Sequence, residues 1–269
     1  DIHDIRPRYK LIGQTIAASI VAIYGKMLIE NITIFGLPEI NFGIWAYPIT
    51  IVFIVACINI INLIDGLDGL SSGLSSIFYL TTGIICIYQG RSGSLEMTLT
   101  FIMLGSTLGF LLHNFYPAKI FAGDCSMFMG YMIAIISLLG FKGTAFTSLF
   151  IPLAIIGIPI IDTLFAIIRR LLKGQAPFSP DKEHIHYQLL GMNLSQRATV
   201  LIIYAIDILF ALTSIFYVLK DPGAARIIYI ILILIMIWFV CNTSIITEKI
   251  PTKITQIETT MKEKIKNKK

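Results

Sequence analysis

Charged residues are scarce in this sequence of 269 residues, at 14% against 56% hydrophobic residues. Soluble domains carry about 25% charged residues, and a mean hydropathy of +0.81 is more than one water-soluble core of this size can enclose. The composition therefore excludes a single soluble domain. The apolar runs are long and continuous rather than alternating, which argues against a transmembrane β-barrel and predicts an all-α, polytopic membrane bundle.

Cysteine is also rare, and no spacing of the four cysteines is typical of a disulfide framework or a zinc site. Cys57, Cys86 and Cys241 lie inside apolar runs, and Cys125 lies in a polar motif. The chain starts at Asp1 with neither a methionine nor a signal-peptide pattern. We therefore expect that its natural N-terminus is missing.

Eight apolar runs are long enough, or nearly long enough, to span a bilayer, which needs roughly 17–25 residues per helix. They cover residues 11–29, 47–63, 76–89, 98–115, 127–141, 148–168, 198–218 and 227–245. The sequence thus predicts about eight spans within a transmembrane domain over 1–248. A Lys-rich cytoplasmic tail over 249–269 is expected to follow it.

The distribution of positive charge predicts the orientation in the membrane. Sixteen of the 21 lysines and arginines fall on the side that holds the N-terminal segment, so this side is predicted to be cytoplasmic. The same bias explains the net charge of +5 without nucleic acid as a partner. Most acidic motifs fall on this face too, although topology was assigned from Lys and Arg alone, so the active surface is predicted to be cytoplasmic.

The most distinctive motif runs from Asn62 to Leu70. Asn62, Asp65 and Asp68 are spaced by three residues, which on a helical turn would place them on one face. The glycines between them allow backbone or ligand to approach closely. Two carboxylates at a membrane surface suit Mg²⁺ capture or proton abstraction. The alternative is a helix-end turn in which the aspartates only cap.

A second motif, Phe121-Ala122-Gly123-Asp124-Cys125-Ser126, precedes an apolar run and follows Asn114 closely. Asp124 at this place could be a simple helix N-cap. A helix N-terminus also binds anions, so the Asp124 carboxylate could instead hold Mg²⁺ against a diphosphate.

A third motif lies in a long basic loop that contains Arg169-Arg170, His184 and His186. Histidines two residues apart lie on one side of an extended segment. With no cysteine or further histidine nearby, hydrogen bonding to phosphate fits better than metal ligation. The alternative is a solvated loop whose cations only follow the positive-inside bias.

Two further acids are expected to have structural rather than catalytic roles. Asp162 is expected to be a polar helix-end residue beside a proline, and Asp207 a buried intramembrane acid bonded to a neighbouring helix. A secondary transporter with Asp207 in a midplane site is the main alternative from another class, but no internal repeat supports it. A structural membrane scaffold would leave the Asp, Gly and His motifs without a role.

The motifs resemble those of the polyprenyl-phosphate N-acetylhexosamine-1-phosphate transferases, glycosyltransferase family 4, and occur in the same order along the chain. The resemblance extends from Asp1 to about Arg197. Pro177-Phe178 and residues 181–186 are most similar to the undecaprenyl-phosphate N-acetylglucosamine-1-phosphate transferases. The resemblance implies transfer of N-acetylglucosamine 1-phosphate from UDP-N-acetylglucosamine to undecaprenyl phosphate, with release of UMP. This step would start cell-envelope polysaccharide or teichoic acid synthesis. Another UDP-N-acetyl sugar, including UDP-N-acetylmuramoyl-pentapeptide, is the alternative donor.

The resemblance also implies roles for single residues. Asp1 matches the second acid of an Asp-Asp pair, so two or three helices would precede it, and Tyr187 stands where many relatives have another histidine. Expected catalytic residues are Asp1, Asp65, Asp68, His184 and His186; expected substrate contacts are Lys10, Asn62, Asn114 and Phe121; and Asp124 is the expected Mg²⁺ ligand, with Mn²⁺ as a substitute. The expected partners are the UDP-sugar and the polyprenyl phosphate in a plasma membrane, with a homodimer as one possible assembly.

Overall fold

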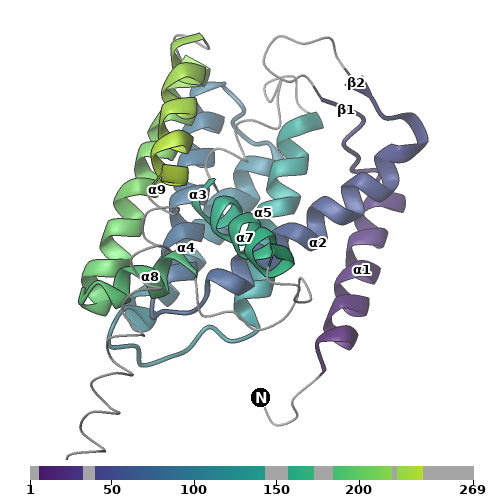
Figure 1. Cartoon of the computed structure of the whole chain (residues 1–269). Coiled ribbons are helices and arrows are strands. Elements are labelled where there is room, and N and C mark those ends of the chain that lie inside the picture. Colours follow the sequence, from purple (N-terminus) through teal and green to yellow (C-terminus); the bar gives the residue numbers. More distant parts are fainter. Residues whose placement is uncertain (1–5, 33–39, 143–156, 173–183, 220–222, 239–269) are drawn as a thin grey trace, which may run out of the picture.

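The computed structural model describes residues 6–32, 40–142, 157–172, 184–219 and 223–238, which form a bundle of α-helices (Figure 1). The helices are α1 (Pro7–Ile23), α2 (Ala46–Ile64), α3 (Leu70–Tyr88), α4 (Leu95–Asn114), α5 (Cys125–Lys142), α7 (Gly157–Leu172), α8 (Ile185–Gly191), α9 (Gln196–Leu219) and a last helix, Gly223–Trp238. A two-stranded antiparallel ribbon, β1 (Asn31–Ile32) and β2 (Ile40–Asn41), and the 3-10 turn η1 (Gly43–Trp45) connect α1 to α2. The predicted all-α fold is confirmed.

Within the described residues, each of the eight predicted apolar runs overlaps one of these helices. Four helices are long and apolar enough to cross a membrane, namely Gly43–Ile64, Leu70–Tyr88, Leu95–Asn114 and Gln196–Leu219. The apolar helices Cys125–Gly140 and Gly223–Trp238 are shorter. The membrane bundle is thus confirmed, whereas the count of eight spans stays a prediction. Asp1 and the expected tail over 249–269 lie outside the described residues.

The sequence placed the start of one helix wrongly. The apolar run begins at residue 76, but α3 begins at Leu70 with a serine-rich first turn that is buried. Ser72 Oγ donates to Asn114 Oδ1 at 2.8 Å, and Ser76 Oγ bonds Thr107 Oγ1 at 3.0 Å. These buried hydroxyls are satisfied by hydrogen bonds within the protein. Because serine has low hydropathy, the apolar run did not include this first turn, which tertiary contacts stabilise.

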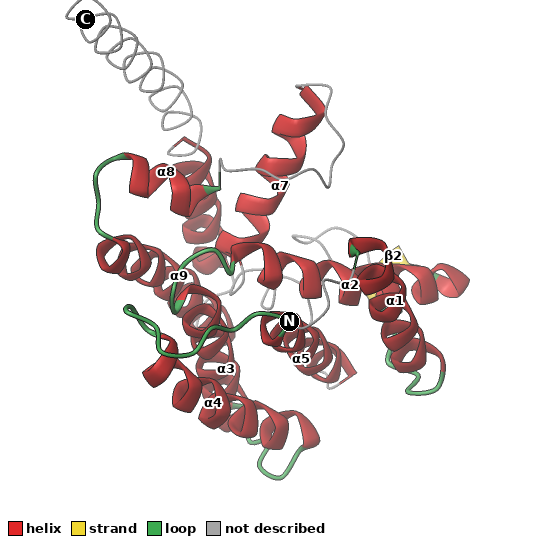
Figure 2. Ribbon diagram, turned by 90° about the horizontal axis from the view of Figure 1, so that it is seen from below, coloured by secondary structure: helices red, strands yellow, loops and turns green. Residues whose placement is uncertain are grey.

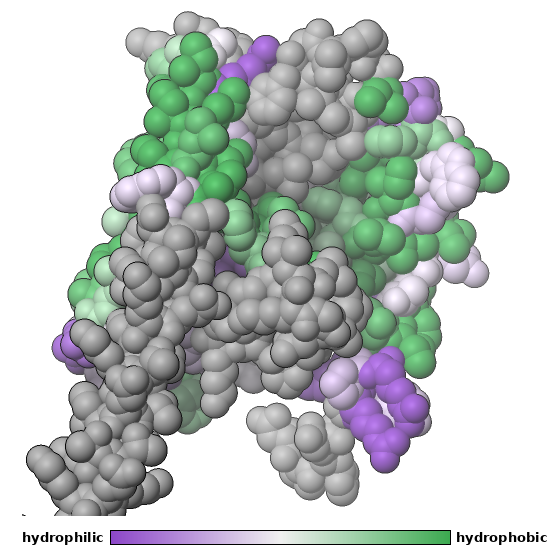
Figure 3. Space-filling view, in the orientation of Figure 1, coloured by the Kyte–Doolittle hydropathy of each residue, from purple (hydrophilic) through white to green (hydrophobic). Residues whose placement is uncertain are grey.

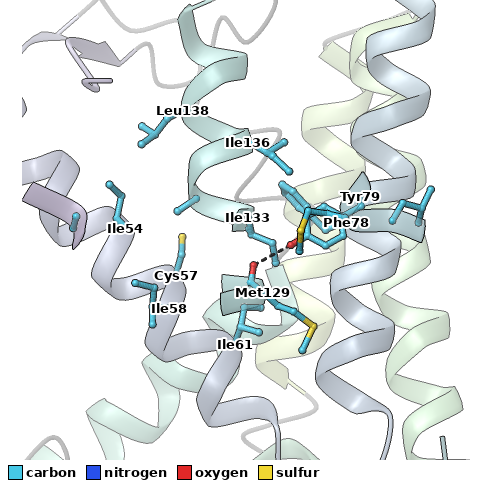
Figure 4. Packing of buried hydrophobic residues seen from close by; sticks show 14 of the residues in the cluster. Ile54, Cys57, Ile58, Ile61, Phe78, Tyr79, Met129, Ile133, Ile136 and Leu138 are labelled. Atoms are coloured by element: carbon cyan, nitrogen blue, oxygen red, sulfur yellow. Dashed lines mark hydrogen bonds between the residues drawn. The ribbon is translucent and has the colours of Figure 1, made fainter. Parts of the chain in front are cut away.

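The main core lies between α2, α3 and α5, where Ile61, Phe78 and Ile133 are almost fully buried (Figure 4). Tyr79 donates its hydroxyl to the Met129 carbonyl at 3.0 Å, so its polar end is also satisfied. A Cβ at Gly130 would lie 2.6 Å from the Cys57 carbonyl oxygen. Because close backbone approach through small residues drives helix association in lipid, Gly130 sets the distance between α2 and α5.

The chain direction brings four helix termini and the short helix α8 together at one end of the bundle. The end of α2, the start of α3, the end of α4, the start of α5 and the short helix α8 all lie at the lower end in Figure 1, which Figure 2 shows from below. Exposed apolar side chains cover the flanks, for example Ile12 and Ile16 on α1 and Leu209 on α9. Hydrophilic surface gathers at the lower end of α1 (Figure 3). The polar motifs are therefore collected at one face of an otherwise apolar body.

Candidate active site

The acidic motif is a loop and not the helical turn that its spacing suggested. α2 ends at Ile64, Asp65 is its C-cap residue, and Gly69 has a φ of 82° just before α3 begins. Asp65 Oδ1 accepts a hydrogen bond from Ser71 Oγ at 2.5 Å. Asp68 Oδ2 accepts one from the Ala118 backbone N–H at 3.1 Å. The two carboxylates are thus oriented by different elements, α3 and the α4–α5 loop.

Burial raises the pKa of the Asp65 carboxyl above its usual range. Hydrogen bonds from Ser71 and Ser126 act in the opposite direction, and the negative charge of Asp68 adds to the increase. A raised pKa brings a carboxylate closer to the range in which it can take up a proton during a reaction. Of the two acids, Asp65 has the environment of a general base.

Asn114 joins the acidic loop to the loop before α5. Its Oδ1 accepts from the Gly69 N–H at 3.1 Å and from Ser72 Oγ at 2.8 Å, and its Nδ2 donates to the Ile120 carbonyl at 2.9 Å. The Tyr204 hydroxyl of α9 donates to the Gly69 carbonyl from the other side. The buried Asn114 amide therefore holds the two loops in register, and in this structure its hydrogen bonds are made within the protein.

The third acid, Asp124, lies directly before α5 and pairs with a cation from α1. The Lys10 ammonium is 2.7 Å from Asp124 Oδ1, and the Asp124 side chain is 61% exposed. One turn further along α1, Gln14 Oε1 accepts from Asn59 Nδ2 on α2 at 2.7 Å. Oδ1 of Asp124 thus bonds a cation instead of capping α5, at an open position on the polar face.

Among the residues that the structure describes, no group of three or more His, Cys, Asp and Glu side chains could hold a metal alone. Mg²⁺ usually binds one or two carboxylates together with substrate phosphates and water. The exposed Asp124 carboxylate already accepts one cation in the form of Lys10. It therefore fits a Mg²⁺ ion that arrives with a diphosphate, and it does not fit a closed protein cage.

The two histidines lie side by side, as their spacing predicted, although at a helix start and not in an extended segment. His184 is the N-cap residue of α8 and His186 lies in its first turn. Their rings are parallel within 3°, with centroids 5.6 Å apart, and both side chains are buried. This excludes a solvated loop for 184–191; residues 173–183 lie outside the described part. Arg169 and Arg170 are in α7.

Asp162 was expected to be only a polar helix-end residue, but the structure places it beside the histidines. Asp162 is buried on α7, and its carboxylate bonds His184 Nδ1 and the Ile185 N–H. Its position near a helix end gave no signal for this contact. Ser71 and Ser126, which bond Asp65, were missed for the same reason: each contact crosses between elements.

His186 packs directly against the acidic loop. Its side chain is 1% exposed, and a Cβ at Gly66 would lie 2.3 Å from its Nε2. Neither ring nitrogen has a hydrogen-bond partner among the described residues. Burial lowers the pKa of His186 to about 4. In this conformation His186 is therefore neutral at pH 7, able to donate and accept one hydrogen bond but not to supply a positive charge.

Lowering the pH from 7 to 5 is expected to destabilise the protein through His186. Between its ordinary pKa of 6.5 and its folded value of about 4, the unfolded chain binds a proton that the folded chain does not. The free energy of unfolding therefore falls as pH falls, by about 2 kcal/mol at pH 5. Thermal unfolding in detergent at both pH values should show a smaller drop for His186→Gln than for wild type, and an unchanged drop for the exposed His113→Gln. Equal drops in all three proteins would contradict this.

Contacts connect most of the predicted site residues into one surface. Lys10 meets Asp124, Asp65 is bonded by Ser126, Asp68 is bonded by the loop that Asn114 holds, and Gly66 touches His186. Phe121 is 75% exposed next to this loop, and Asn62 is partly buried at the end of α2. Asp1 lies outside the described residues. Three motifs that are far apart in the chain thus form one site.

Similarity to known proteins shows the family to which the chain belongs. Residues 1–141, more than half of the chain, match the family model of glycosyl transferase family 4. The chain is 43% identical over 228 residues to a probable undecaprenyl-phosphate N-acetylglucosaminyl 1-phosphate transferase of Bacillus subtilis (strain 168), covering 84% of this chain and 62% of the relative. An alignment of that length in this chain has to include the segment from Asp65 to His186.

Two further relatives have related names. The chain is 32% identical over 252 residues to a decaprenyl-phosphate N-acetylglucosaminephosphotransferase of Mycolicibacterium smegmatis (85% of this chain, 61% of the relative). It is 34% identical over 217 residues to an undecaprenyl-phosphate alpha-N-acetylglucosaminyl 1-phosphate transferase of Salmonella typhi (78% and 59%). The chain spans about three fifths of the length of these relatives. With the family match and the conjunction of its three motifs, the chain belongs to glycosyl transferase family 4.

Proposed function

We propose that the protein transfers N-acetylglucosamine 1-phosphate from UDP-N-acetylglucosamine to undecaprenyl phosphate and releases UMP. The observation that carries this proposal is the convergence of the Asp65–Asp68 loop, Asp124 and the His184–His186 pair at one end of an apolar bundle. The names of the relatives support the sugar and the lipid. The positive-inside bias supports a site on the cytoplasmic face of the plasma membrane.

The proposed reaction joins two anions, so neutralising their charge is the main task of the site. A phosphate oxygen of the lipid attacks the sugar-bearing phosphorus, and the bond from that phosphorus to the UMP oxygen breaks. Asp124 would hold a Mg²⁺ ion against the diphosphate, and this ion would neutralise charge on the phosphate oxygens. Lys10, which lies 2.7 Å from Asp124, is placed to bring a further positive charge to the same group.

The remaining residues have separate tasks in this proposal. Asp65, whose burial raises its pKa, accepts a proton from the lipid phosphate or orients it. Asp68 is fixed by the Ala118 N–H and contacts the nucleotide. The exposed ring of Phe121 offers a face on which uracil can stack, as bases do on aromatic side chains. His186 donates a hydrogen bond to the diphosphate, and His184 accepts one at Nε2 from a hydroxyl of the sugar phosphate.

The proposal is tested by incubating the full-length protein in membranes with undecaprenyl phosphate, Mg²⁺ and radiolabelled UDP-N-acetylglucosamine. We expect label in the lipid phase, an equal amount of released UMP, and loss of both on chelation with EDTA. Product from another UDP-N-acetyl sugar alone would correct the donor.

Absence of product with every donor would contradict the proposal. The transporter alternative would then be tested by uptake into proteoliposomes with an Asp207→Asn control. Asp207 is buried in α9, and its Oδ1 has no hydrogen-bond partner among the described residues.

A further inference from the structure

Asp162 on α7 makes two hydrogen bonds with the first residues of the histidine segment. Its Oδ2 lies 3.0 Å from His184 Nδ1, and its Oδ1 accepts the Ile185 N–H at 2.8 Å. Both side chains of the Asp162–His184 pair are 5% exposed. Water is thus kept from the pair, and each carboxylate oxygen has its own protein donor.

The chemistry of this contact selects one form of His184. A carboxylate can only accept hydrogen bonds, so the Nδ1 that faces Asp162 has to carry the hydrogen. In a neutral imidazole this leaves Nε2 with the lone pair. The assignment follows from the hydrogen-bond network. Asp162 therefore determines which nitrogen of His184 can take part in chemistry, and it fixes the ring orientation.

The surroundings of the pair connect it to the acidic loop. The His186 ring is parallel to His184 at 5.6 Å and touches the place where Gly66 has no Cβ. Gly66 follows Asp65 directly. A change in the orientation of His184 is thus transmitted to the ring that packs on this loop, because interiors are close-packed.

We propose that Asp162 is a positioning residue that holds His184 as the Nδ1–H tautomer and keeps Nε2 available to the substrate. This inference rests on the proposed function, in which His184 binds the sugar phosphate through Nε2. Asp162 acts through His184 and does not contact the substrate. Asp162 lies outside the three sequence motifs. Its role would make α7 a further element that supports the site.

Asp162→Asn separates this role from a merely structural one. The asparagine keeps the volume, and its carbonyl oxygen can still accept the Ile185 N–H. Its amide nitrogen would then face His184 Nδ1 as a donor and favour the Nε2–H tautomer. We expect kcat to fall by about 10²-fold, within the range by which positioned acid–base groups contribute, and KM for the UDP-sugar to change much less.

Two measurements in the full-length protein test the mechanism of this loss. ¹⁵N NMR of histidine-labelled protein should show Nδ1–H for His184 in wild type and Nε2–H in Asp162→Asn. In a double-mutant cycle, Asp162→Asn should add nothing to His184→Ala, because residues that act as a unit are not additive. Asp207→Asn is the matched control, as a buried aspartate outside the site, and should keep wild-type kcat.

The outcomes distinguish the inference from the proposed function. Inactive wild type would refute the proposed function, while the tautomer of His184 would still be read by NMR. Active wild type with an unchanged kcat or an unchanged tautomer in Asp162→Asn would overturn the inference, as would additive effects in the cycle. If Asp162→Asn does not fold, Asp162→Glu serves instead. It should retain the Nδ1–H tautomer and more activity than His184→Ala, and a switched tautomer in it would overturn the inference.

Discussion

Replacing Asp124 with asparagine is expected to lower the Mg²⁺-dependent transfer rate by about 10³-fold or more. Stabilisation of transition-state charge by a bound metal is worth several kcal/mol, and about 4 kcal/mol corresponds to this factor. Asparagine keeps the shape of the side chain but removes the charge that holds the cation. The rate is measured with saturating UDP-N-acetylglucosamine and undecaprenyl phosphate over a series of Mg²⁺ concentrations.

Loss of folding would not explain such a decrease. The ion pair of Asp124 with Lys10 is partly exposed, at 61% and 29% for the two side chains, and pairs of this kind contribute about 0–1 kcal/mol. The melting temperature should therefore change little. Glu30→Gln is the matched control and should keep full activity, because Glu30 is an exposed acid directly before β1, which lies at the upper end in Figure 1.

A second readout of Asp124 is independent of turnover. Binding of Mn²⁺ in the presence of UDP-N-acetylglucosamine, followed by electron paramagnetic resonance, should weaken strongly in Asp124→Asn and stay unchanged in Glu30→Gln. Wild-type activity of Asp124→Asn at low Mg²⁺ would remove Asp124 from the site.

Gly66→Ala is expected to reduce transfer by about 10²-fold while the protein stays folded. The new Cβ would lie 2.3 Å from Nε2 of His186, a separation that no real contact allows, so the ring or the acidic loop has to move. Misplacement of a site by about 1 Å can cost 10²-fold in rate. Gly66 is not among the residues with a positive φ, so backbone strain does not contribute to this effect.

Two comparisons show whether the effect passes through His186. Gly105→Ala is the matched control, because a Cβ there meets nothing within 4 Å, and alanine favours the helix at this position in α4. The double variant Gly66→Ala/His186→Ala should be no less active than His186→Ala alone. If Gly66→Ala is fully active, the contact of His186 with the acidic loop is irrelevant to turnover.

The acidic motif could be found in the sequence, but its conformation could not be predicted from it. The spacing of Asn62, Asp65 and Asp68 was consistent with one helical face. However, residue spacing alone does not show that α2 ends at Ile64. The helix ends there because the loop finds partners elsewhere, in Ser71, Ala118 and Asn114. The residues were identified from their chemistry, whereas their geometry followed from bonds to distant elements.

For the two histidines, the sequence predicted the relative position of the rings but not the effect of burial on their charge. Their spacing predicted neighbouring rings, and the rings are indeed parallel. Their residue types suggested hydrogen bonding to phosphate, and the structure adds that burial lowers the pKa of His186 to about 4, so that this ring is neutral at pH 7. Burial against Gly66 depends on how α8 packs on the loop after α2, and no local pattern in the sequence encodes it.

The sequence by itself determined the membrane class, the all-α fold, the approximate positions of the apolar helices and the three motifs that carry the chemistry. These depend on composition, on the length of apolar runs and on residue type, all of which are local. Only the tertiary structure decided that Lys10 pairs with Asp124, that Asn114 joins two loops and that Asp162 holds His184. Each of these contacts joins a residue on one helix to a loop or helix terminus elsewhere in the fold, and its existence depends on how the helices pack together.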